Sequence, residues 1–407
     1  MNALPPAGQT DPLASFAALR TPEGAALLAE VRDHDPAQEL ATATRLRRTH
    51  PAALVSAALG QARLRQRAVA KFGAEDAYRM FFTPHGVEQA TRTSVAGYRA
   101  ERFAELGVRS VADLCCGIGG DAIALARAGI SVLAVDRDPL TAQVARANAE
   151  ALGLQDLVEV RCADVVETDT SPYDAVFVDP ARRGGRGGRG RIFDPEAYSP
   201  PLSWATGAAL KAPRAALKIA PGVPHEAIEP QAEAEWISDG GDVKEAVLWF
   251  GAGFTPGAFR ATLLPSRTAL VSDGPLPAPP VGPVGRYLYE PDGAVIRAHL
   301  VADIVERCEG RLIDETIAYV TSDRPYESDA TTAYEITDQM PFNMKKLKAL
   351  LRQRQVGVLT VKKRGSAVEP EELRRKMKLQ GPHAATVFLT RVAGAPTMLI
   401  GQPVKRA

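Results

Sequence analysis

The sequence predicts an α/β fold with a parallel sheet at its centre, preceded by a helical domain and followed by a smaller α+β domain. Between residues 108 and 272, short apolar runs alternate with helical segments, which is typical of parallel strands covered by helices on both faces. Over residues 1–80, apolar residues recur at three and four positions, the helical period. A run of prolines and glycines at 273–285 predicts a linker before the last domain.

The composition excludes several classes of protein. At 407 residues, with 45% hydrophobic and 24% charged, the chain suits two or three globular domains and is neither disordered throughout nor collagen-like. No run approaches the roughly 18–20 apolar residues that span a bilayer. The N-terminus lacks a secretory pattern, and the four cysteines are too scattered for a disulfide framework. We therefore expect a cytoplasmic protein that does not enter a membrane.

Residues 1–80 are expected to form a helical domain without chemistry of its own. Thr21-Pro22 supplies a cap followed by proline at the first helical position, and His50-Pro51 marks a second helix start. The basic run 63–71 is interpreted as a solvated helix face, with contact to RNA as the alternative.

Seven apolar runs of the central region are interpreted as strands. They are 108–114, 131–136, 157–164, 173–179, 215–220, 243–250 and 260–264. In residues 286–407 we expect strands at Y-L-Y, A-V-I, L-I-D-E-T-I-A-Y-V, V-G-V-L-T-V-K and T-V-F-L-T-R, with helices near 343–353 and 370–379.

The strongest chemical signal is the run V-A-D-L-C-C-G-I-G-G-D at 111–121. Its three glycines lie between a strand and a helix, where missing side chains let the backbone turn tightly and approach a ligand. A dinucleotide site would need G-x-G-x-x-G and an unopposed helix N-terminus for pyrophosphate. Here Asp113 precedes the glycines and Asp121 follows them, so the site suits a ligand with an amino group instead.

Acidic residues stand at the carboxyl ends of four predicted strands: Asp113, Asp136, Asp164 and Asp179. Open α/β sheets bind their ligands at this edge. Asp136 is placed to accept both hydroxyls of a ribose. Four such acids are hard to explain by packing alone.

The run from Val111 to Arg182 resembles class I S-adenosylmethionine-dependent methyltransferases, and within them the RNA guanine-N2 group that includes trimethylguanosine synthase. The resemblance rests on D-L-C-C-G-I-G-G-D, V-D-R-D-P-L-T-A-Q-V-A-R-A-N-A-E-A-L-G-L, C-A-D and Y-D-A-V-F-V-D-P-A-R, with F-F-T-P-H-G-V-E-Q-A-T-R upstream. It covers residues 81–272. It implies a Rossmann-like core with a mostly parallel seven-stranded sheet, and S-adenosyl-L-methionine as the cofactor.

The resemblance also implies roles for individual residues. Cofactor-binding residues would be Asp113, Gly117 and Gly119 at the methionine part, Asp136 at the ribose, Asp164 at the adenine amino group, and Thr83 and Pro84 closing over the cofactor.

The fourth strand carries the catalytic candidates. Amino-methylating enzymes have Asp, Asn or Ser there, followed by Pro-Pro and an aromatic residue; Asp179 and Pro180 match, whereas Ala181 and Arg182 depart. The departure leaves open which base is methylated, and whether a base is methylated at all. D-P-A-R-R is also similar to the D-P-P-R of uracil-5-methyltransferases, but the next strand lacks their nucleophilic cysteine. Lys218 in that strand either pairs with a carboxylate or reaches the substrate.

The Arg/Gly stretch 182–191 follows directly. Its Arg182 and Arg183 are candidates for substrate binding through phosphate, and a surface loop is the alternative. Cys115 and Cys116 are interpreted as small packing residues. The six histidines never pair at metal-ligand spacing, so we expect no metal.

Charge is uneven in the last domain. Residues 286–339 hold 5 Lys or Arg and 12 Asp or Glu, whereas 340–407 hold 15 and 3. This asymmetry predicts a face for a polyanion, and the layout resembles the THUMP-like RNA-binding modules of RNA methyltransferases. A solvated helix face is the alternative. The substrate-binding candidates here are Lys345, Lys346, Lys362, Lys363 and Arg364.

Together these observations predict a methyltransferase that uses S-adenosyl-L-methionine on an exocyclic amino group of a base in structured RNA. Two alternatives stay open. One is a methyltransferase for a protein or a small molecule, and the other is an inactive RNA-binding protein on the same fold.

Overall fold

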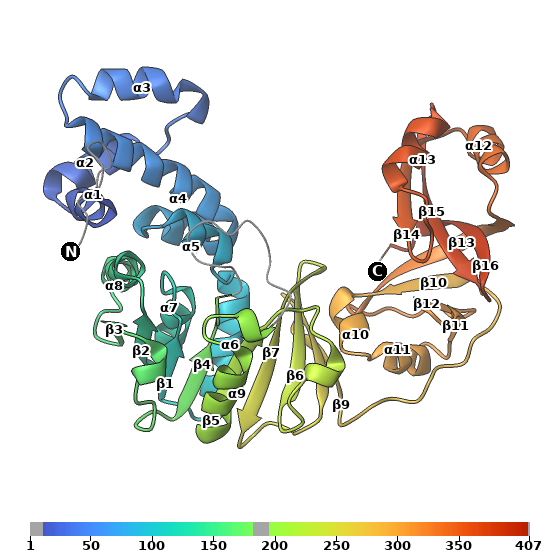
Figure 1. Cartoon of the computed structure of the whole chain (residues 1–407). Helices are drawn as coiled ribbons and strands as arrows, with labels where there is room; N and C mark the ends of the chain where they lie inside the picture. The colour runs from blue at the N-terminus through green and yellow to red at the C-terminus, as the bar shows by residue number, and fades with distance from the viewer. Residues whose placement is uncertain (1–10, 182–194, 406–407) are drawn as a thin grey trace. The chain divides into compact units, whose positions relative to one another are not determined.

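The computed structural model describes residues 11–181 and 195–405, and the chain divides into two compact units (Figure 1). The first comprises Met1–Ile219 with Leu248–Phe254, and the second comprises Ala220–Val247 with Thr255–Ala407. All four acids that end the predicted strands belong to the first unit.

The first unit begins with helices, as predicted: α1 (Pro12–Leu19), α2 (Pro22–Glu30), the short η1 (Pro36–Gln38), α3 (Glu39–Leu46) and α4 (Ala52–Arg79). Thr21 caps α2 by accepting a hydrogen bond from Gly24 N at 3.1 Å, and Pro22 takes the first helical position. The helix α4 follows Pro51 and is kinked at Gly73, whose φ is 76°. A cluster of buried apolar side chains, including Leu27, Leu46 and Leu59, holds these helices together.

After α5 (Pro84–Gln89) and α6 (Thr93–Glu105), strands and helices alternate. The strands are β1 (Ser110–Leu114), β2 (Ser131–Asp136), β3 (Val158–Cys162), β4 (Ala175–Val178), β5 (Arg214–Ile219), β6 (Glu233–Asp239), β7 (Asp242–Gly251), β8 (Phe259–Leu264) and β9 (Thr268–Ser272). The helices are α7 (Gly120–Arg127), α8 (Pro139–Leu152) and α9 (Leu202–Lys211), with short turns η2 (Val165–Glu167), η3 (Pro195–Ala197) and η4 (His225–Ala227). In the sheet, α8 packs on β2 and β3, and α9 packs on β4 and β5 (Figure 1).

These strands form one sheet in the order β3-β2-β1-β4-β5-β7-β6-β8-β9. The resemblance implied a mostly parallel sheet of seven strands, and this prediction is wrong in the number of strands. The sheet has nine strands and is mixed, because β9 runs antiparallel to β8. The β1, β2, β3 and β4 strands are mutually parallel, with Asp113 opposite Ala134 and Asp136 opposite Cys162.

In this nine-stranded sheet, the sequence pattern does not predict the strands β6 and β9. In β6 two glutamates point into the core, which removes the apolar run that marks a strand. Glu233 accepts from Arg260 Nε at 2.8 Å and Glu235 accepts from Thr262 Oγ1 at 2.5 Å, so the neighbouring β8 satisfies both carboxylates. The turn from β6 to β7 is Gly240-Gly241, both with positive φ, as a two-residue hairpin requires.

The rest of the second unit is an α+β structure around a seven-stranded sheet in the order β11-β12-β10-β13-β16-β15-β14. Its strands are β10 (Tyr287–Pro291), β11 (Arg311–Asp314), β12 (Ile317–Ser322), β13 (Thr331–Pro341), β14 (Val356–Lys363), β15 (His383–Val392) and β16 (Ala395–Pro403). Its helices are α10 (Gly293–Arg297), α11 (Val301–Arg307), α12 (Met344–Gln353) and α13 (Pro370–Met377). Leu347, Leu351 and Leu373 anchor α12 and α13 in a core with side chains from β14, β15 and β16.

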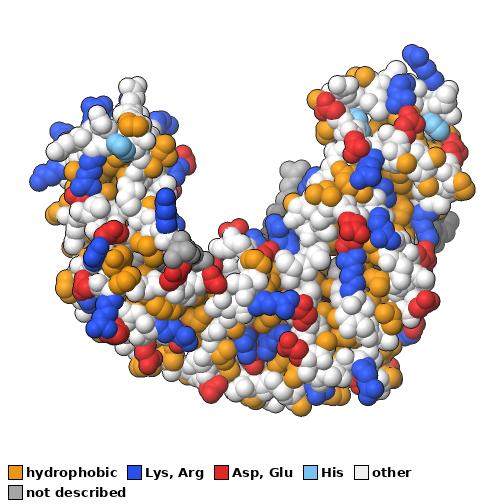
Figure 2. Space-filling view, turned by 180° about the vertical axis from the view of Figure 1, so that it is seen from behind, with side chains coloured by type: hydrophobic (Ala, Val, Ile, Leu, Met, Phe, Trp, Pro, Cys, Tyr) orange, Lys and Arg blue, Asp and Glu red, His pale blue; other side chains and the backbone are white. Residues whose placement is uncertain are grey.

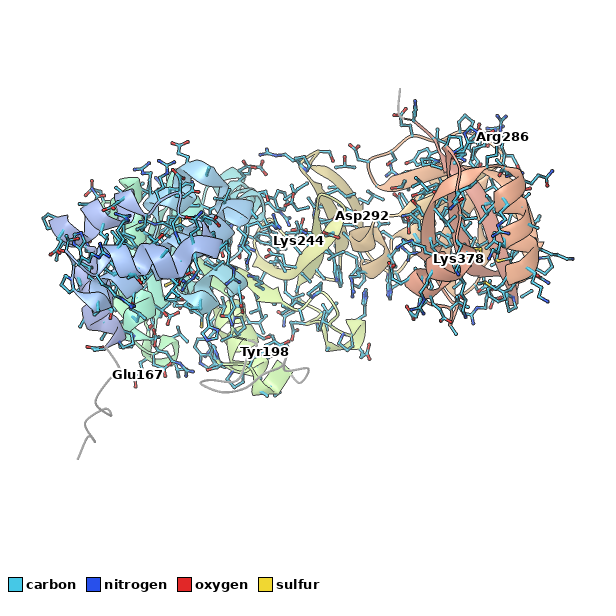
Figure 3. The ribbon with its side chains drawn as sticks, turned by 90° about the horizontal axis from the view of Figure 1, so that it is seen from above. Glu167, Tyr198, Lys244, Arg286, Asp292 and Lys378 are labelled. Atoms are coloured by element: carbon cyan, nitrogen blue, oxygen red, sulfur yellow. The ribbon has the colours of Figure 1, made fainter. Side chains whose placement is uncertain are left out.

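One predicted strand of this part is wrong. The A-V-I run lies in α10, a helix that begins after Asp292, labelled in Figure 3. The Asp292 side chain accepts from Ala294 N at 2.7 Å and caps the helix. A three-residue apolar run is too short for its period to separate strand from helix.

Among the residues that the structure describes, no helix is long and apolar enough to cross a bilayer. On the face that Figure 2 shows, Lys and Arg side chains are interspersed with Asp and Glu side chains, in keeping with the small net charge.

Candidate active site

The candidate site lies at the carboxyl edge of β1 to β4, where the sheet presents four acids. Asp113 is in β1, Asp136 ends β2, Asp164 follows β3 and Asp179 follows β4. Because these strands are parallel, their ends share one edge. The sequence-predicted acids are therefore brought together by the topology.

The glycine-rich loop between β1 and α7 is held in left-handed backbone conformations. The φ angles are 67° at Cys115, 57° at Gly117 and 86° at Gly119. At Gly119 a side chain would meet α8, since a Cβ there would lie 3.4 Å from the Cβ of Ala145. The glycines thus let the loop turn sharply and let α8 pack against it.

Asp136 is fixed by the loop it faces. Its Oδ2 accepts from Gly117 N at 3.1 Å, and its Oδ1 accepts from Asp138 N at 2.9 Å. Burial raises the pKa of this carboxyl, although the two backbone N–H groups oppose the rise. Each oxygen keeps a further acceptor position, which is what a pair of neighbouring hydroxyl groups needs.

Asp113 is fully buried, and within residues 11–181 and 195–405 neither of its carboxylate oxygens has a hydrogen-bond partner. Burial raises its pKa well above the ordinary value, and the nearby carboxylates of Asp121, Asp179 and Asp136 raise it further. A buried acid without a partner is costly unless a ligand pairs with it. The amino group of S-adenosylmethionine is a cation that fits this position.

Arg99 of α6 is the main site residue that sequence reasoning missed. Its side chain is 1% exposed, forms an ion pair with Asp121 and stacks on the Phe177 ring, with 4.3 Å between the guanidinium carbon and the ring centroid. It also lowers the pKa of Asp113 in opposition to the nearby acids. The available signal was its position on the apolar face of α6, four residues from both Val95 and Phe103.

Lys218 of β5 pairs with a carboxylate, the first of the two roles that the sequence leaves open. Its Nζ lies 2.7 Å from Asp179 Oδ2 and 2.9 Å from Thr91 Oγ1. The Lys218 side chain is 5% exposed, whereas that of Asp179 is 25% exposed. Asp179 is thus anchored from the protein side and still reaches solvent. Pro180, beside it, is buried.

The upstream segment 80–84 is held by two side-chain amides, one of which also binds the glycine loop. Asn148 accepts from Phe81 N at 2.6 Å and donates to Phe81 O at 3.0 Å and to Ile118 O at 2.9 Å. Gln61 of α4 accepts from Phe82 N and donates to Phe82 O in the same way. The segment and the loop are therefore fixed together.

The helix α5 continues this contact. Thr83 caps it by accepting from Gly86 N at 2.9 Å, and Pro84 is its first residue. At Gly86 an added Cβ would lie only 2.4 Å from Ile118 Cγ2, so α5 presses directly on the glycine loop. Thr83 and Pro84 stand beside the loop that the resemblance assigns to the cofactor.

The remaining predicted residues of this unit are Asp164, Arg182, Arg183 and the two cysteines of the glycine loop. Asp164 is exposed and accepts from Val166 N at 3.0 Å, while Arg182 and Arg183 lie outside the described residues. Burial and the nearby acids raise the pKa of Cys115 and Cys116, which keeps both as thiols. The described part of the chain holds no group of three His, Cys, Asp or Glu side chains arranged for a metal ion.

The five basic candidates of the second unit differ in their surroundings. Lys345 and Lys346 are exposed on α12, and neither side chain takes part in an ion pair within the described ranges. Lys362 pairs with Glu290, Lys363 with Glu369 at 2.6 Å, and Arg364 with Glu290 at 3.5 Å. The two α12 lysines are thus the better placed for an external anion.

Three family models match the chain. Residues 108–194 match RNA cap guanine-N2 methyltransferase, residues 331–403 match THUMP domain-like, and residues 11–68 match a domain of unknown function. The guanine-N2 and THUMP-like resemblances are thereby confirmed.

Two known proteins resemble the chain over most of its length. An uncharacterised S-adenosylmethionine-dependent methyltransferase of Mycobacterium tuberculosis is 34% identical over 342 residues, which cover 81% of this chain and 90% of that protein. A crystal structure assigned to a methyltransferase of Porphyromonas gingivalis W83 superposes with a TM-score of 0.73 at 21% identity, covering 91% of this chain and 99% of the other, and shows the shared fold. The chain belongs to the S-adenosylmethionine-dependent methyltransferases.

Proposed function

We propose that this methyltransferase modifies an exocyclic amino group of a base in RNA. The observation that carries the proposal is Asp179-Pro180 at the end of β4, with the Asp179 carboxylate anchored by Lys218 and partly open to solvent. The match of residues 108–194 to guanine-N2 methyltransferases and of 331–403 to THUMP-like domains supports an RNA acceptor.

The cofactor contacts that the resemblance implies are part of this proposal. Asp113 would pair with the amino group of S-adenosyl-L-methionine, Asp136 would accept from the ribose hydroxyls, and Asp164 would accept from the adenine amino group. Gly117 and Gly119 would let the backbone approach the methionine part, with Thr83 and Pro84 covering it. The cofactor supplies an electrophilic methyl group on a sulfonium.

The chemistry asked of the protein is positioning. Oδ1 of Asp179, the oxygen that Lys218 does not hold, would accept an N–H of the acceptor amine and orient the nitrogen lone pair for the transfer. With the cofactor bound, its sulfonium would give up the methyl group to the nitrogen and keep the electron pair of the carbon–sulfur bond, and the surplus amine proton would pass to Asp179 or to water. The Lys218 ammonium holds Oδ2, so the carboxylate cannot rotate away from the substrate.

We further propose that the chain is organised as a helical domain (1–80), the methyltransferase domain (81–272), a linker (273–285) and a THUMP-like RNA-binding domain (286–407). In this arrangement Lys345 and Lys346 contact phosphate, whereas Lys362, Lys363 and Arg364 first have to leave their acidic partners. Arg182 and Arg183 are proposed to contact phosphate near the reacting group.

The test is transfer of labelled methyl from S-adenosylmethionine to total RNA, with Asp179→Ala as the blank. The expected result is label in RNA that the Ala variant loses while it keeps cofactor affinity. Equal loss of cofactor binding and transfer would refute the role of Asp179. Label in protein or in small molecules, with none in RNA, would refute the RNA acceptor, and cofactor binding without any transfer would indicate an inactive RNA-binding protein.

A further inference from the structure

The second unit contains an open cavity of about 590 Å³ that has no part in the proposed chemistry. It is lined by the segment that follows β5 and by α10 with its flanking residues. The side chains around it include His225, Trp236, Arg297, His299, Arg364 and the carboxylate of Glu226.

Three aromatic rings form a ladder at this cavity. His225 lies 5.0 Å from Trp236 with 13° between the ring planes, and His299 lies 3.7 Å from His225 with 8° between the planes. Trp236 is 1% exposed and closes the bottom of the ladder, whereas His299 is exposed at its top. The ladder therefore offers a flat ring to a further planar group.

The His225 ring is fixed in the middle of this ladder. Its Nε2 donates to Arg297 O at 2.7 Å, and Trp236 Nε1 donates to Pro221 O at 3.0 Å. Both rings are thus held by main-chain acceptors. Burial and the neighbouring His225 lower the pKa of His299, which favours the neutral ring that stacks best.

The backbone of His299 is in a conformation that favours glycine. It follows the C-terminal end of α10 with φ of 56°, and the next residue closes the turn through Leu300 N to Val295 O at 3.0 Å. Glycine is the usual residue at this position of such a turn. A histidine is strained there, and strained residues gather at binding sites.

Two guanidinium groups border the same cavity. Arg297 is exposed, and its Nη1 donates to Pro221 O at 2.9 Å; in the described part of the chain its other N–H groups make no hydrogen bond. Arg364 lies over the Tyr319 ring at 5.2 Å and shares Glu290 with Lys362. A flat ring flanked by arginines matches a nucleotide, whose base stacks and whose phosphate pairs with guanidinium.

We infer that this cavity binds an unpaired nucleotide of the RNA substrate, with the base stacked on His299 and the phosphate held by Arg297, and by Arg364 once it leaves Glu290. The inference rests on the proposed RNA acceptor and adds to it a place where a single-stranded part of that RNA is held. The site reads no particular base, since every base has a face that stacks.

The test uses His299→Gly in the full chain, with binding of a fluorescein-labelled single-stranded RNA as the readout. Glycine removes the ring and relieves the backbone, so the thermal midpoint is expected to stay or rise while RNA affinity falls about tenfold, the loss of one base stack. The matched control is Ala393→Gly, which relaxes a φ of 47° elsewhere in the unit and should leave RNA affinity unchanged. Arg297→Gln should weaken binding and reduce the salt slope by about 0.7, the value of one phosphate contact on a single strand.

The outcomes separate this inference from the proposed function. His299→Gly is expected to raise the KM for RNA about tenfold with kcat kept. If the wild type methylates RNA and His299→Gly leaves RNA binding and KM unchanged, the nucleotide site is overturned and the proposed function stands. A thermal midpoint of the variant that falls in proportion to its loss of RNA affinity would also overturn the nucleotide site, because the variant would then be unfolding. No transfer to RNA by the wild type would refute the proposed function instead. GMP binding that His299→Gly abolishes, with RNA binding unchanged, would assign the cavity to free nucleotides and overturn the inference.

Discussion

Lys218→Met is the substitution that most directly probes the site, because it removes a buried cation from the Asp179 carboxylate and keeps the aliphatic volume. Breaking a buried ion pair costs about 3–5 kcal/mol. Because the Asp179 side chain is 25% exposed, water replaces part of the lost interaction, and we expect about 1–3 kcal/mol of lost stability. Thr91 Oγ1 loses the same donor, so the segment after α5 is loosened as well.

Activity should fall more than stability suggests. Without the Lys218 ammonium the Asp179 carboxylate is free to rotate, and misplacement of a reacting group by about 1 Å costs about a hundredfold in rate. We expect kcat to drop by about that factor while affinity for S-adenosylmethionine stays within about twofold, since Asp113 and Asp136 are untouched. Labelled methyl transfer gives kcat, and calorimetry gives the cofactor affinity.

Two controls make the result interpretable. Lys211→Met removes an exposed lysine at the end of α9 and should change neither quantity. The second control combines Lys218→Met with Asp179→Asn, which should cost little beyond Asp179→Asn alone if the two residues act as a pair. The reasoning would be refuted if the double variant lost a further hundredfold in kcat relative to Asp179→Asn alone. A normal kcat in Lys218→Met would refute it as well.

Three further predictions concern the cofactor and the RNA. Asp136→Ala should weaken cofactor binding by about 1–3 kcal/mol in calorimetry, because the ribose hydroxyls lose their acceptors; unchanged affinity would contradict the assignment. Asp113 has a raised pKa, so in the cofactor-free protein its carboxyl stays protonated at pH values where the unfolded chain has lost this proton, and stability falls as pH rises above the unfolded pKa. Pairing with the cofactor ammonium would favour the ionised carboxylate and oppose this loss. The thermal shift on adding S-adenosylmethionine should therefore grow with pH in the wild type and be flat in Asp113→Asn, and equal slopes would rule the pairing out. Replacing Lys345 and Lys346 by Gln should lower the dependence of RNA binding on salt by about 1.4 in slope, two contacts at about 0.7 each; an unchanged slope would mean that α12 does not meet phosphate.

The sequence pattern predicts the α/β core well because its strands are apolar runs that end in acids. The same pattern fails where burial is polar: β6 carries Glu233 and Glu235 into the core, and only the pairing with β8 shows why this is tolerated. It also fails for α10, where the Asp292 cap decides between helix and strand.

For the site, the four strand-end acids and Asp121 follow from the sequence. The sequence does not identify Arg99 as the partner of Asp121, and it leaves the role of Lys218 open between two alternatives. Arg99 lies 22 residues from Asp121, and Lys218 lies 39 residues from Asp179. Such contacts depend on how α6 and β5 pack in the folded chain, which one sequence does not specify locally. The state of Asp113, which is buried and has no hydrogen-bond partner among the described residues, likewise emerges only from the packed structure.

The amide contacts of Gln61 and Asn148 determine how far the chain can be shortened from its N-terminal side without disturbing the cofactor loop. Each amide pairs with the N–H and C=O of one residue, Phe82 and Phe81, as a neighbouring strand would. A protein shortened to begin at residue 81 would lack Gln61. The N–H and C=O of Phe82 would then lose the side-chain amide that binds them, beside the loop that contains Ile118. The segment next to the cofactor loop thus depends on a helix that precedes it, so the long α4 belongs to the smallest piece that keeps the loop in shape.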